Sequence, residues 1–335
     1  MILPGADPAA IEAAAQALAR GELVGLPTET VYGLGADADN PLAAAGVFAA
    51  KGRPSDHPLI VHVSDASQAS HYADPIPPIA QRLMSAHWPG PLTLILPRRP
   101  GVADASAGGQ ASIGLRCPSH PVAQALMRAA QALGVRGIAA PSANRFGRVS
   151  PTTAGHVQEE LGGDLLIVDG GACDVGIEST IIDCTRGHPV LLRPGMLPLD
   201  TLSAAAGEPV LTPEAFAQLS TAPAQAPRAS GTLESHYAPM ARVHLLSSVA
   251  LQARLDALAH DALRHRCGVW ARTGLRVPPG VVSRTMPANA ADCAHALFGE
   301  LRAFDRSGLT DILVESPPDS AAWDGVRDRL TRAAA

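Results

Sequence analysis

The sequence predicts an α/β protein, in which a domain built on a twisted mixed sheet precedes a small Rossmann-like, doubly wound domain. Over the first two hundred residues, short apolar segments mix with amphipathic ones without strict alternation, which favours a mixed sheet. After residue 241, strand and helix patterns alternate regularly, as they do in a parallel sheet. Hydrophobic residues make up 47% and charged residues 17% of the chain, which is typical of a globular core.

The first domain is expected to span residues 1–203. Asn40 and Pro41 supply a capping side chain and a pre-set first turn for a helix that Gly52 ends. The other elements are expected, in chain order, as a helix at 11–20, strands at 23–26, 59–63, 92–96 and 113–116, a helix at 121–133, and strands at 137–140, 165–168, 180–183 and 190–193.

A linker at 204–240 is expected to join this domain to a second one at 241–335. Its part from 204 to 228 is rich in Ala and Pro, which predicts an irregular connection. Elements of the second domain are expected as strands at 243–246, 268–271, 281–285 and 312–315, with helices at 249–264, 290–304 and 323–333.

Charge and composition exclude several classes of protein. The net charge of −5 and the aromatic content of 3% disfavour a protein that coats nucleic acid by charge or by base stacking. The five cysteines are widely spaced and never form a Cys-x-x-Cys pair, so neither a disulfide framework nor a zinc site is indicated. No signal peptide and no membrane-spanning apolar run are recognised, and we expect a cytoplasmic protein without membrane contact.

Lys51 is the only lysine among 26 basic side chains. It stands two residues before Arg53 in a polar, turn-rich stretch, so the two cations can face one anion, and a phosphate chain is the natural partner. Lysine is a compact point charge where arginine is a planar fork, so a site can require one and refuse the other. On spacing alone, a solvated basic turn fits equally well.

Two further candidates follow expected strands. Ser142 and Asn144 come directly after the strand at 137–140, where ligands commonly bind in α/β sheets, although such residues also favour simple turns. Arg193 closes an apolar strand, which places its charge either at a solvent edge or on a ligand.

Other patterns are weak. The stretch Gly33-Leu34-Gly35-Ala36-Asp37-Ala38 matches a dinucleotide fingerprint formally, but a glycine-rich turn explains it better. His57 and His62 lack an acidic partner at metalloprotease spacing, which disfavours a metal site. No P-loop and no nucleophile elbow occur. The residues alone indicate an α/β protein with a cationic pocket for a nucleoside triphosphate.

Seven ordered motifs closely resemble those of the YrdC-domain family. They are Pro27-Thr28-Glu29-Thr30-Val31-Tyr32-Gly33-Leu34-Gly35, Lys51-Gly52-Arg53-Pro54, Pro58-Leu59-Ile60-Val61-His62, Trp88-Pro89-Gly90-Pro91-Leu92-Thr93, Ala140-Pro141-Ser142-Ala143-Asn144, Gly176-Ile177-Glu178-Ser179-Thr180 and Leu192-Arg193-Pro194-Gly195. The segment Ser235-His236-Tyr237-Ala238-Pro239 and the tail resemble the long, two-domain form of that family. The resemblance implies a YrdC-like catalytic domain followed by the Rossmann-like one.

The resemblance also implies an activity. The enzyme would be a nucleotidyltransferase that makes threonylcarbamoyl-AMP and pyrophosphate from L-threonine, bicarbonate and ATP, for the threonylcarbamoyladenosine modification of tRNA beside the anticodon. Lys51 and Arg53 would be catalytic. The implied ATP contacts are Lys51, Arg53, His57, Ser112, Ser142, Asn144, Ser150, Arg193 and Tyr237. The implied threonine contacts are Thr30, His62, Arg116, Ala140 and Ser179.

No metal-binding residues are implied, because Mg²⁺ would arrive with ATP and be held mainly by its phosphates. The linker could cover the active site and shield a labile carbamate from water. Implied partners are the proteins that transfer the product to tRNA, with at most a weak contact to tRNA itself. The chain departs from the family pattern at Leu233-Glu234-Ser235-His236-Tyr237, where a basic run is common, and at Ser112, where threonine is common.

Two alternatives belong to other classes. The same domain type has been linked to double-stranded RNA, so an RNA-binding module is conceivable, although the acidic net charge disfavours it. A carbamoyl-transfer enzyme of hydrogenase maturation uses a related domain, but it would need an acylphosphatase-like segment and Cys-x-x-Cys motifs, and neither occurs.

Overall fold

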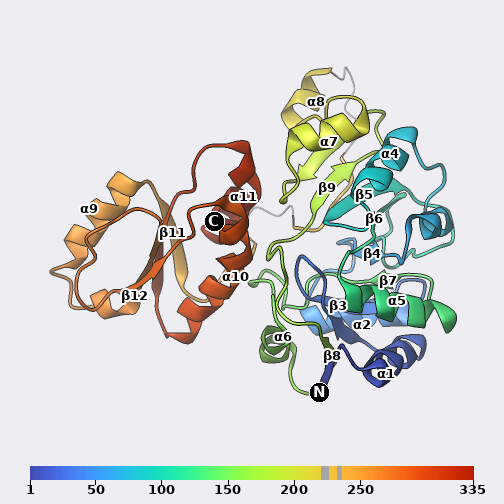
Figure 1. Cartoon of the computed structure of the whole chain (residues 1–335), viewed down its shortest axis with the longest axis horizontal. Coiled ribbons are helices and arrows are strands. Elements are labelled where there is room, and N and C mark those ends of the chain that lie inside the picture. The colour runs from blue at the N-terminus through green and yellow to red at the C-terminus, as the bar shows by residue number, and fades with distance from the viewer. Residues whose placement is uncertain (220–225, 232–235) are drawn as a thin grey trace. The chain divides into compact units, whose positions relative to one another are not determined.

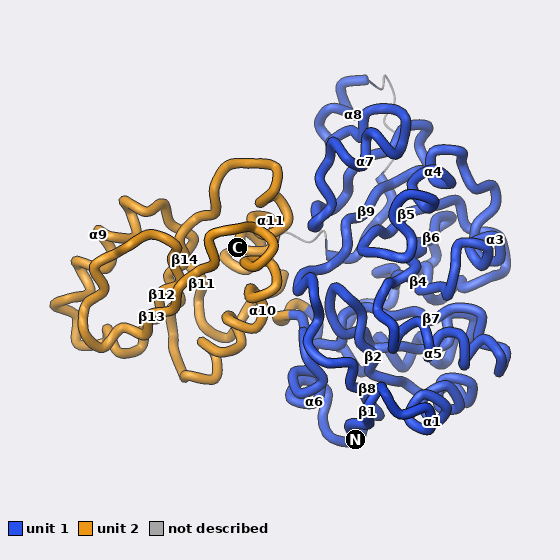
Figure 2. Tube along the Cα trace, viewed as in Figure 1, with its two compact units in different colours: residues 1–146, 150–232 blue, residues 147–149, 233–335 orange. Residues whose placement is uncertain are grey.

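The computed structural model describes residues 1–219, 226–231 and 236–335, and the chain divides into two compact units (Figure 2). Unit 1 comprises residues 1–146 and 150–232, and unit 2 comprises residues 147–149 and 233–335. The described part of the expected linker up to residue 231 therefore belongs to unit 1. Figure 1 labels the helices and strands of both units.

Unit 1 is organised around a mixed sheet. Among the described residues its strand order is β1 (Ile2–Pro4), β8 (Leu166–Asp169), β2 (Val24–Leu26), β3 (Gly33–Asp37), β7 (Ile138–Ala139), β4 (Ile60–His62), β6 (Ser112–Arg116), β5 (Leu92–Pro97), β9 (Thr180–Asp183) and β10 (Val190–Arg193). The sheet contains parallel pairs (β1 with β8, β2 with β8, β4 with β6, β5 with β9) and antiparallel ones. The expected twisted mixed-sheet domain is confirmed.

Helices cover this sheet. They are α1 (Pro8–Ala19), α2 (Pro41–Lys51), α3 (Ala69–Tyr72), α4 (Pro78–His87), α5 (Pro121–Ala132), α6 (Ala154–Leu161), α7 (Leu199–Ala206) and α8 (Pro213–Leu219), with a 3₁₀ turn at Ala66–Gln68. One apolar cluster joins α1 and α5 to strands β2, β7 and β8. A larger cluster joins strands β3 to β6 with α2 and α4. Removing these apolar faces from water is the main stabilising contribution of such packing.

The ends of α2 follow from its sequence and place the lysine. Asn40 Oδ1 accepts hydrogen bonds from the amides of Leu42 and Ala43, so the helix starts where the cap dictates. Gly52 has φ +62°, the left-handed conformation that ends a helix and that glycine adopts without steric cost. Lys51 is consequently the last residue of α2, so the backbone position from which its side chain extends is fixed by the helix.

Unit 2 is a small parallel α/β unit. Its strand order is β11 (Arg242–Leu246), β14 (Asp311–Glu315), β12 (Cys267–Ala271) and β13 (Val282–Thr285), and its helices are α9 (Ser248–Leu258), α10 (Ala290–Arg306) and α11 (Asp324–Ala333), with 3₁₀ turns at Arg264–Arg266 and Ala321–Trp323. All described pairs in this sheet are parallel, which confirms the expected doubly wound unit. Leucines of α9 pack on strands β12 and β14.

Several expectations about elements were wrong. The stretch 33–38, expected to be a turn, contains strand β3, where Gly35 packs so closely that a Cβ there would lie 2.7 Å from Leu26 Cδ2. The stretch 204–228, expected to be irregular, contains helix α8 and the end of α7. The helix expected at 249–264 stops at Leu258. Helices α3, α4 and α6 and strand β1 were not expected at all.

Candidate active site

Three polar side chains form a row across the middle of the unit 1 sheet. Arg116, the last residue of β6, pairs in register with His62 of β4 on one side and with Thr93 of β5 on the other. Directly paired residues on neighbouring strands point to the same face of a sheet. All three are buried, at 4% or less exposed. The strands therefore present a guanidinium between an imidazole and a hydroxyl.

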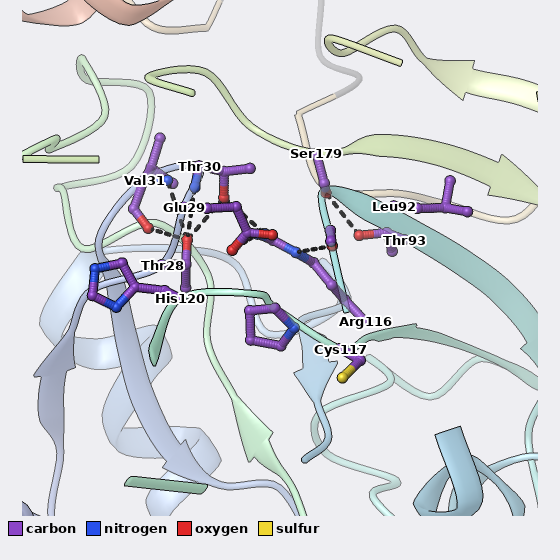
Figure 3. A network of polar contacts seen from close by, with 12 residues as sticks. Thr28, Glu29, Thr30, Val31, Leu92, Thr93, Arg116, Cys117, His120 and Ser179 are labelled. Carbon is purple, nitrogen blue, oxygen red and sulfur yellow. Dashed lines mark hydrogen bonds and ion pairs between the residues drawn. The ribbon is translucent and has the colours of Figure 1, made fainter. Parts of the chain in front are cut away.

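Arg116 is held on three sides by polar groups (Figure 3). Its Nη1 donates to Thr30 Oγ1 at 2.8 Å, and its Nε donates to the carbonyl of Gly90 at 3.4 Å. Its Nη2 lies 2.8 Å from Glu29 Oε2 in an ion pair whose side chains are 5% and 6% exposed. This geometry fixes the plane of the guanidinium, which is the condition for bidentate binding of a carboxylate.

The loop between β2 and β3 supplies Thr30 through a local hydrogen-bond network. Thr28 Oγ1 accepts from the amides of Thr30 and Val31, each at 3.2 Å, and donates to the carbonyl of Val31 at 2.6 Å. It also shares a 2.8 Å hydrogen bond with Thr30 Oγ1 (Figure 3). Because these bonds satisfy the loop's own backbone, the Thr30 hydroxyl is positioned before any ligand arrives.

His62 is buried and uncharged. Burial and the neighbouring Arg116 lower the pKa of His62 to about 3, against a smaller opposite effect of Glu29. Its Nδ1 makes no hydrogen bond of ordinary geometry with any described residue. A neutral imidazole with spare bonding capacity beside a guanidinium can accept or donate one hydrogen bond to a small polar ligand.

Ser179 connects this row to a second cation. Its hydroxyl shares a 2.7 Å hydrogen bond with Thr93 Oγ1 (Figure 3) and accepts from Arg193 Nη2 at 3.2 Å. The Ser179 carbonyl also accepts from Nε and Nη2 of Arg193, at 3.1 and 2.9 Å. Arg193, at the end of β10, is 3% exposed. The structure therefore places Arg193 in a buried position against Ser179 and not at a solvent edge.

Arg193 and Arg53 meet at the described end of the linker. Arg193 Nη1 donates to the carbonyl of Ser230 at 2.9 Å, and Arg53 Nη2 donates to its hydroxyl at 3.1 Å. Arg53 Nη2 also donates to the carbonyl of Pro58 at 2.7 Å. One serine thus bridges two guanidinium groups that lie 140 positions apart in the chain (193 − 53).

Lys51 is 3% exposed, and its Nζ donates to the carbonyls of Ser142 and Asn144. Burial, and then repulsion by Arg53, lower the pKa of Lys51 to about 7, while Glu160 and Glu178 act weakly in the opposite direction. An ammonium group that is this easily deprotonated gains most from a nearby anion, which restores the usual pKa. The only lysine of the chain therefore lies where a phosphate would stabilise it.

The remaining expected ATP contacts in unit 1 surround these cations. His57 packs edge-on against Phe146 at 5.5 Å, and burial and Arg53 lower its pKa. Ser150 donates its hydroxyl to Glu178 Oε1. Asn144 is 1% exposed and donates from Nδ2 to the carbonyl of Arg145.

Ser112 and Ala140 lie on strands of the same sheet or beside them. Ser112 begins β6 and lines a surface hollow of about 610 Å³ together with residues that include Thr185 and Arg228. Ala140 follows β7, and its amide donates to the carbonyl of Ile60 at 3.0 Å. Tyr237 belongs to unit 2, where its ring packs against Phe298.

The structure thus gathers the expected threonine contacts Thr30, His62 and Ser179 around Arg116. It also links the expected ATP contacts Lys51, Arg53 and Arg193. The role of each residue, including the ATP contact of Tyr237, stays a prediction. Sequence reasoning missed the roles of Glu29, Thr93 and Ser230 as partners of these side chains. Glu29 and Thr93 stand inside recognised motifs, which was the available signal, whereas nothing in the sequence pointed to Ser230.

Within the described residues, no group of three or more His, Cys, Asp or Glu side chains is arranged to hold a metal ion. In the same part of the chain, no helix has the length and apolar character needed to cross a membrane.

Comparisons with known proteins agree with this geometry. Residues 16–195 match a family profile described as telomere recombination, and residues 202–335 match one described as threonylcarbamoyl-AMP synthase, C-terminal domain. A Bacillus subtilis threonylcarbamoyl-AMP synthase is 38% identical over 98% of this chain and 93% of its own length. A Pyrococcus abyssi protein of the same name is 45% identical over 70% of this chain and 66% of its own length. A crystal structure of P. abyssi Sua5 complexed with L-threonine has a TM-score of 0.86 at 36% identity, covering 98% of this chain and 95% of that one.

Proposed function

The chain belongs to the threonylcarbamoyl-AMP synthase family, and from that premise we propose that it converts L-threonine, bicarbonate and ATP into threonylcarbamoyl-AMP and pyrophosphate. The observation that carries the proposal is the position of Ser179. Its hydroxyl contacts Thr93 beside Arg116 and also contacts Arg193. A guanidinium suited to an amino acid carboxylate is therefore linked, through one serine, to the cations suited to a triphosphate.

The chemistry needs no covalent enzyme intermediate. The amine of threonine combines with bicarbonate to give a carbamate and water, and a carbamate oxygen then attacks the α-phosphorus of ATP. Pyrophosphate leaves, and the carbamate oxygen becomes the bridge between carbon and phosphorus. The protein contributes positioning and electrostatic stabilisation, which supply most of the catalysis in phosphoryl transfer.

Each charged group has a distinct task in this proposal. Arg116 binds the carboxylate of threonine, with its plane fixed by Thr30. Lys51, Arg53 and Arg193 offset the negative charge that develops on the phosphates. We assign ATP contacts to His57, Ser112, Ser142, Asn144, Ser150 and Tyr237, and threonine contacts to His62, Ala140 and Ser179.

The triphosphate is the magnesium complex of ATP, so the metal ion enters as part of the substrate. Mg²⁺ keeps much of its water shell and is usually held through phosphates and few protein carboxylates. This arrangement demands no cluster of acidic ligands from the chain.

The proposal extends to the setting of the reaction. We infer a cytosolic enzyme whose product is taken up by the proteins that transfer the threonylcarbamoyl group to tRNA. Contact with tRNA itself is expected to be weak, because the chain carries a net charge of −5 and cannot neutralise many backbone phosphates.

The test is a reconstitution with ATP, Mg²⁺, radiolabelled bicarbonate and a panel of amino acids. The proposal expects a labelled adenylate and release of pyrophosphate that depend on L-threonine. Product formation independent of amino acid, or none with any of them, would contradict it. An RNA-binding module would instead show RNA affinity that falls steeply with salt and ignores threonine and ATP.

A further inference from the structure

The candidate active site contains a buried ion pair between Glu29 and Arg116. Glu29 is 5% exposed and Arg116 is 4% exposed, and their charged atoms lie 2.8 Å apart. Taking two charges out of water costs free energy that a single pairing rarely offsets in full. A buried pair of this kind is therefore weak as a stabilising device, and a role in binding is a better explanation for it.

Several buried polar atoms around this ion pair lack a hydrogen-bond partner among the described residues. Apart from the ion pair, neither oxygen of Glu29 makes a hydrogen bond of ordinary geometry with a described residue, and the same holds for Nη2 of Arg116. His62, which pairs with Arg116 across neighbouring strands, likewise has no such bond at its Nδ1. Buried polar atoms are nearly always hydrogen-bonded in folded proteins. Several such atoms in one place indicate a site for a small polar ligand.

The charges of the site match a zwitterion. Burial alone would raise the pKa of Glu29, but Arg116 outweighs it and holds the pKa below its usual value, helped by the nearby amides of Glu29 and Ser119. Glu29 is therefore an anion beside the cationic Arg116, and His62 is neutral. An α-amino acid carries its carboxylate and its ammonium group on one carbon, so it can meet both charges of the pair at once.

We propose that Glu29 receives the ammonium group of the amino acid substrate while Arg116 receives its carboxylate. The pair would then select an α-amino acid with a free amino group. Thr30, which is bonded to Arg116, and Ser179 and His62 contribute neutral polar atoms to the same site. This inference deepens the proposed function and rests on it for the identity of the substrate.

In this assignment, Glu29 interacts in opposite ways with the substrate before and after carbamoylation. Before carbamoylation the substrate nitrogen is a cation and is attracted by Glu29. Its reaction with bicarbonate releases water and one proton to the solvent and leaves a carbamate. After carbamoylation it carries an anionic carboxylate group, which the same side chain repels. Ser179 leads from this site to Arg193, so the cations on the phosphate side attract the group that Glu29 repels. Glu29 thus attracts the ammonium group of the unreacted amino acid, and it repels the carbamate toward the cations on the phosphate side.

The test compares two ligands on the full chain by calorimetric titration. One is L-threonine, and the other is its α-hydroxy analogue, which keeps the carboxylate and side chain but has a neutral hydroxyl in place of the ammonium group. For Glu29→Gln we expect affinity for L-threonine to fall about 10- to 100-fold, the value of one charge-assisted hydrogen bond. Affinity for the analogue should change less than about twofold, because Gln leaves Arg116 free for the carboxylate.

Equal losses for both ligands would overturn the proposal, since they would mean that Glu29 only orients Arg116. Unchanged binding of L-threonine would overturn it as well. Glu22→Gln, which alters an exposed carboxylate paired with Arg20, is the matched control and should change neither affinity. If Glu29→Gln does not fold, the wild-type protein still decides the matter: it must bind L-threonine more tightly than the analogue. A wild-type protein that binds no L-threonine overturns the proposed function itself, whereas normal binding with no preference over the analogue overturns the Glu29 assignment alone.

Discussion

Arg193 donates from Nη1 to the carbonyl of Ser230 at 2.9 Å, while its Nη2 holds the carbonyl of Ser179. The described linker residues thus bond directly to a cation that we assign to the triphosphate. A carbonyl dipole is a weaker partner for a guanidinium than a phosphate is. We therefore expect ATP to displace Ser230, so that the linker segment 226–231 would compete with the nucleotide for the same donors.

If segment 226–231 competes with ATP, removing a contact that anchors the segment should strengthen ATP binding. Arg228 anchors it through an exposed ion pair with Asp56 at 3.3 Å and a hydrogen bond to the carbonyl of Gly108 at 3.0 Å. Arg228→Ala should lower KM for ATP by a few fold and leave KM for threonine unchanged. Steady-state kinetics with each substrate varied in turn measures both. Arg20→Ala, which removes another exposed ion pair, is the control; a higher KM for ATP in Arg228→Ala would contradict the competition.

Lys51 should not tolerate replacement by arginine. Its ammonium group is enclosed and donates to two carbonyls, those of Ser142 and Asn144, and a planar fork does not fit that point-like site. Lys51→Arg should lower kcat/KM for ATP by roughly 100-fold, and Lys51→Ala by at least as much, the scale for losing one preorganised electrostatic contact. Threonine-dependent pyrophosphate release is the measurement. Wild-type turnover in either variant would remove Lys51 from the site.

The pH dependence of ATP use follows from the same lysine. Because the pKa of Lys51 is about 7 before ATP binds, the free enzyme loses this positive charge as pH rises through neutrality. We expect kcat/KM for ATP to decline above about pH 7, and kcat to decline only at higher pH, because bound phosphate raises the pKa. Lys51→Arg keeps its charge and should lack this decline. An identical alkaline decline in that variant would assign the titration to another group.

Removing Arg116 should destabilise unit 1 in a pH-dependent way. In the wild-type protein the pKa of Glu29 is lowered, so this carboxylate contributes stability above its unfolded-state pKa, and the contribution is lost as pH falls through the folded-state pKa. In Arg116→Met, only the amides of Glu29 and Ser119 still oppose burial, so we expect the pKa of Glu29 to rise and the sign to reverse. We expect a loss of about 3–5 kcal/mol at neutral pH that shrinks in mild acid.

Urea unfolding of unit 1, followed by deuterium uptake of peptides from that unit at neutral and mildly acidic pH, measures this effect. The double variant Arg116→Met with Glu29→Gln removes the stranded charge and should recover part of the loss at neutral pH. A loss that is the same at both pH values would mean that the missing charge of Arg116 is not what destabilises the variant.

Unit 2 offers an independent acid-sensitive carboxylate. Glu315 is fully buried at the end of β14, where it accepts from the amides of Arg272 and Thr273 at 2.6 and 3.0 Å and from Ser248 Oγ at 2.7 Å. Burial opposes the ionisation of Glu315, but the hydrogen bonds from these donors outweigh burial and lower its pKa. Its stabilising contribution is present above the unfolded-state pKa and is lost as pH falls through the folded-state pKa.

Glu315→Ala should therefore cost unit 2 about 2–4 kcal/mol at neutral pH, because several buried donors lose their acceptor. Deuterium uptake of peptides from β12 and β14 in increasing urea reports it. Glu300→Ala, which breaks a more exposed pair with Arg284, is the control and should cost about 1 kcal/mol or less. Equal effects of the two substitutions would contradict a special role for Glu315.

Local rules predicted the elements whose signals lie within a few residues. The cap at Asn40 and the stop at Gly52 fixed α2 at both ends, and continuous apolar runs located β5 and β9. Strand β3 was not predicted because glycine is unfavourable in strands, and the close packing of Leu26 and Ile138 against Gly35 cannot be seen in the sequence. Helix α8 was not predicted, because a stretch rich in alanine and proline is also typical of an irregular connection.

The residues of the candidate site also fall into those that local sequence predicted and those that it did not. Lys51, Arg53 and Arg193 were visible as unusual residues at the ends of apolar segments. Glu29 was visible only as part of a motif, since a carboxylate between two threonines has no distinctive spacing, and its partner Arg116 is 87 positions away (116 − 29). Ser230 lies in an Ala- and Pro-rich stretch without a pattern. Long-range pairings of this kind are decided by the register of strands and not by local sequence.

The central claim is that an amino acid on Arg116 and a triphosphate on Lys51, Arg53 and Arg193 meet at Ser179. A crystal structure with L-threonine and a non-hydrolysable ATP analogue tests it most directly. We expect the threonine carboxylate on Arg116, its ammonium group on Glu29, and the phosphates on the three cations. Threonine bound at Arg116 with the phosphates on another surface of the chain would contradict it.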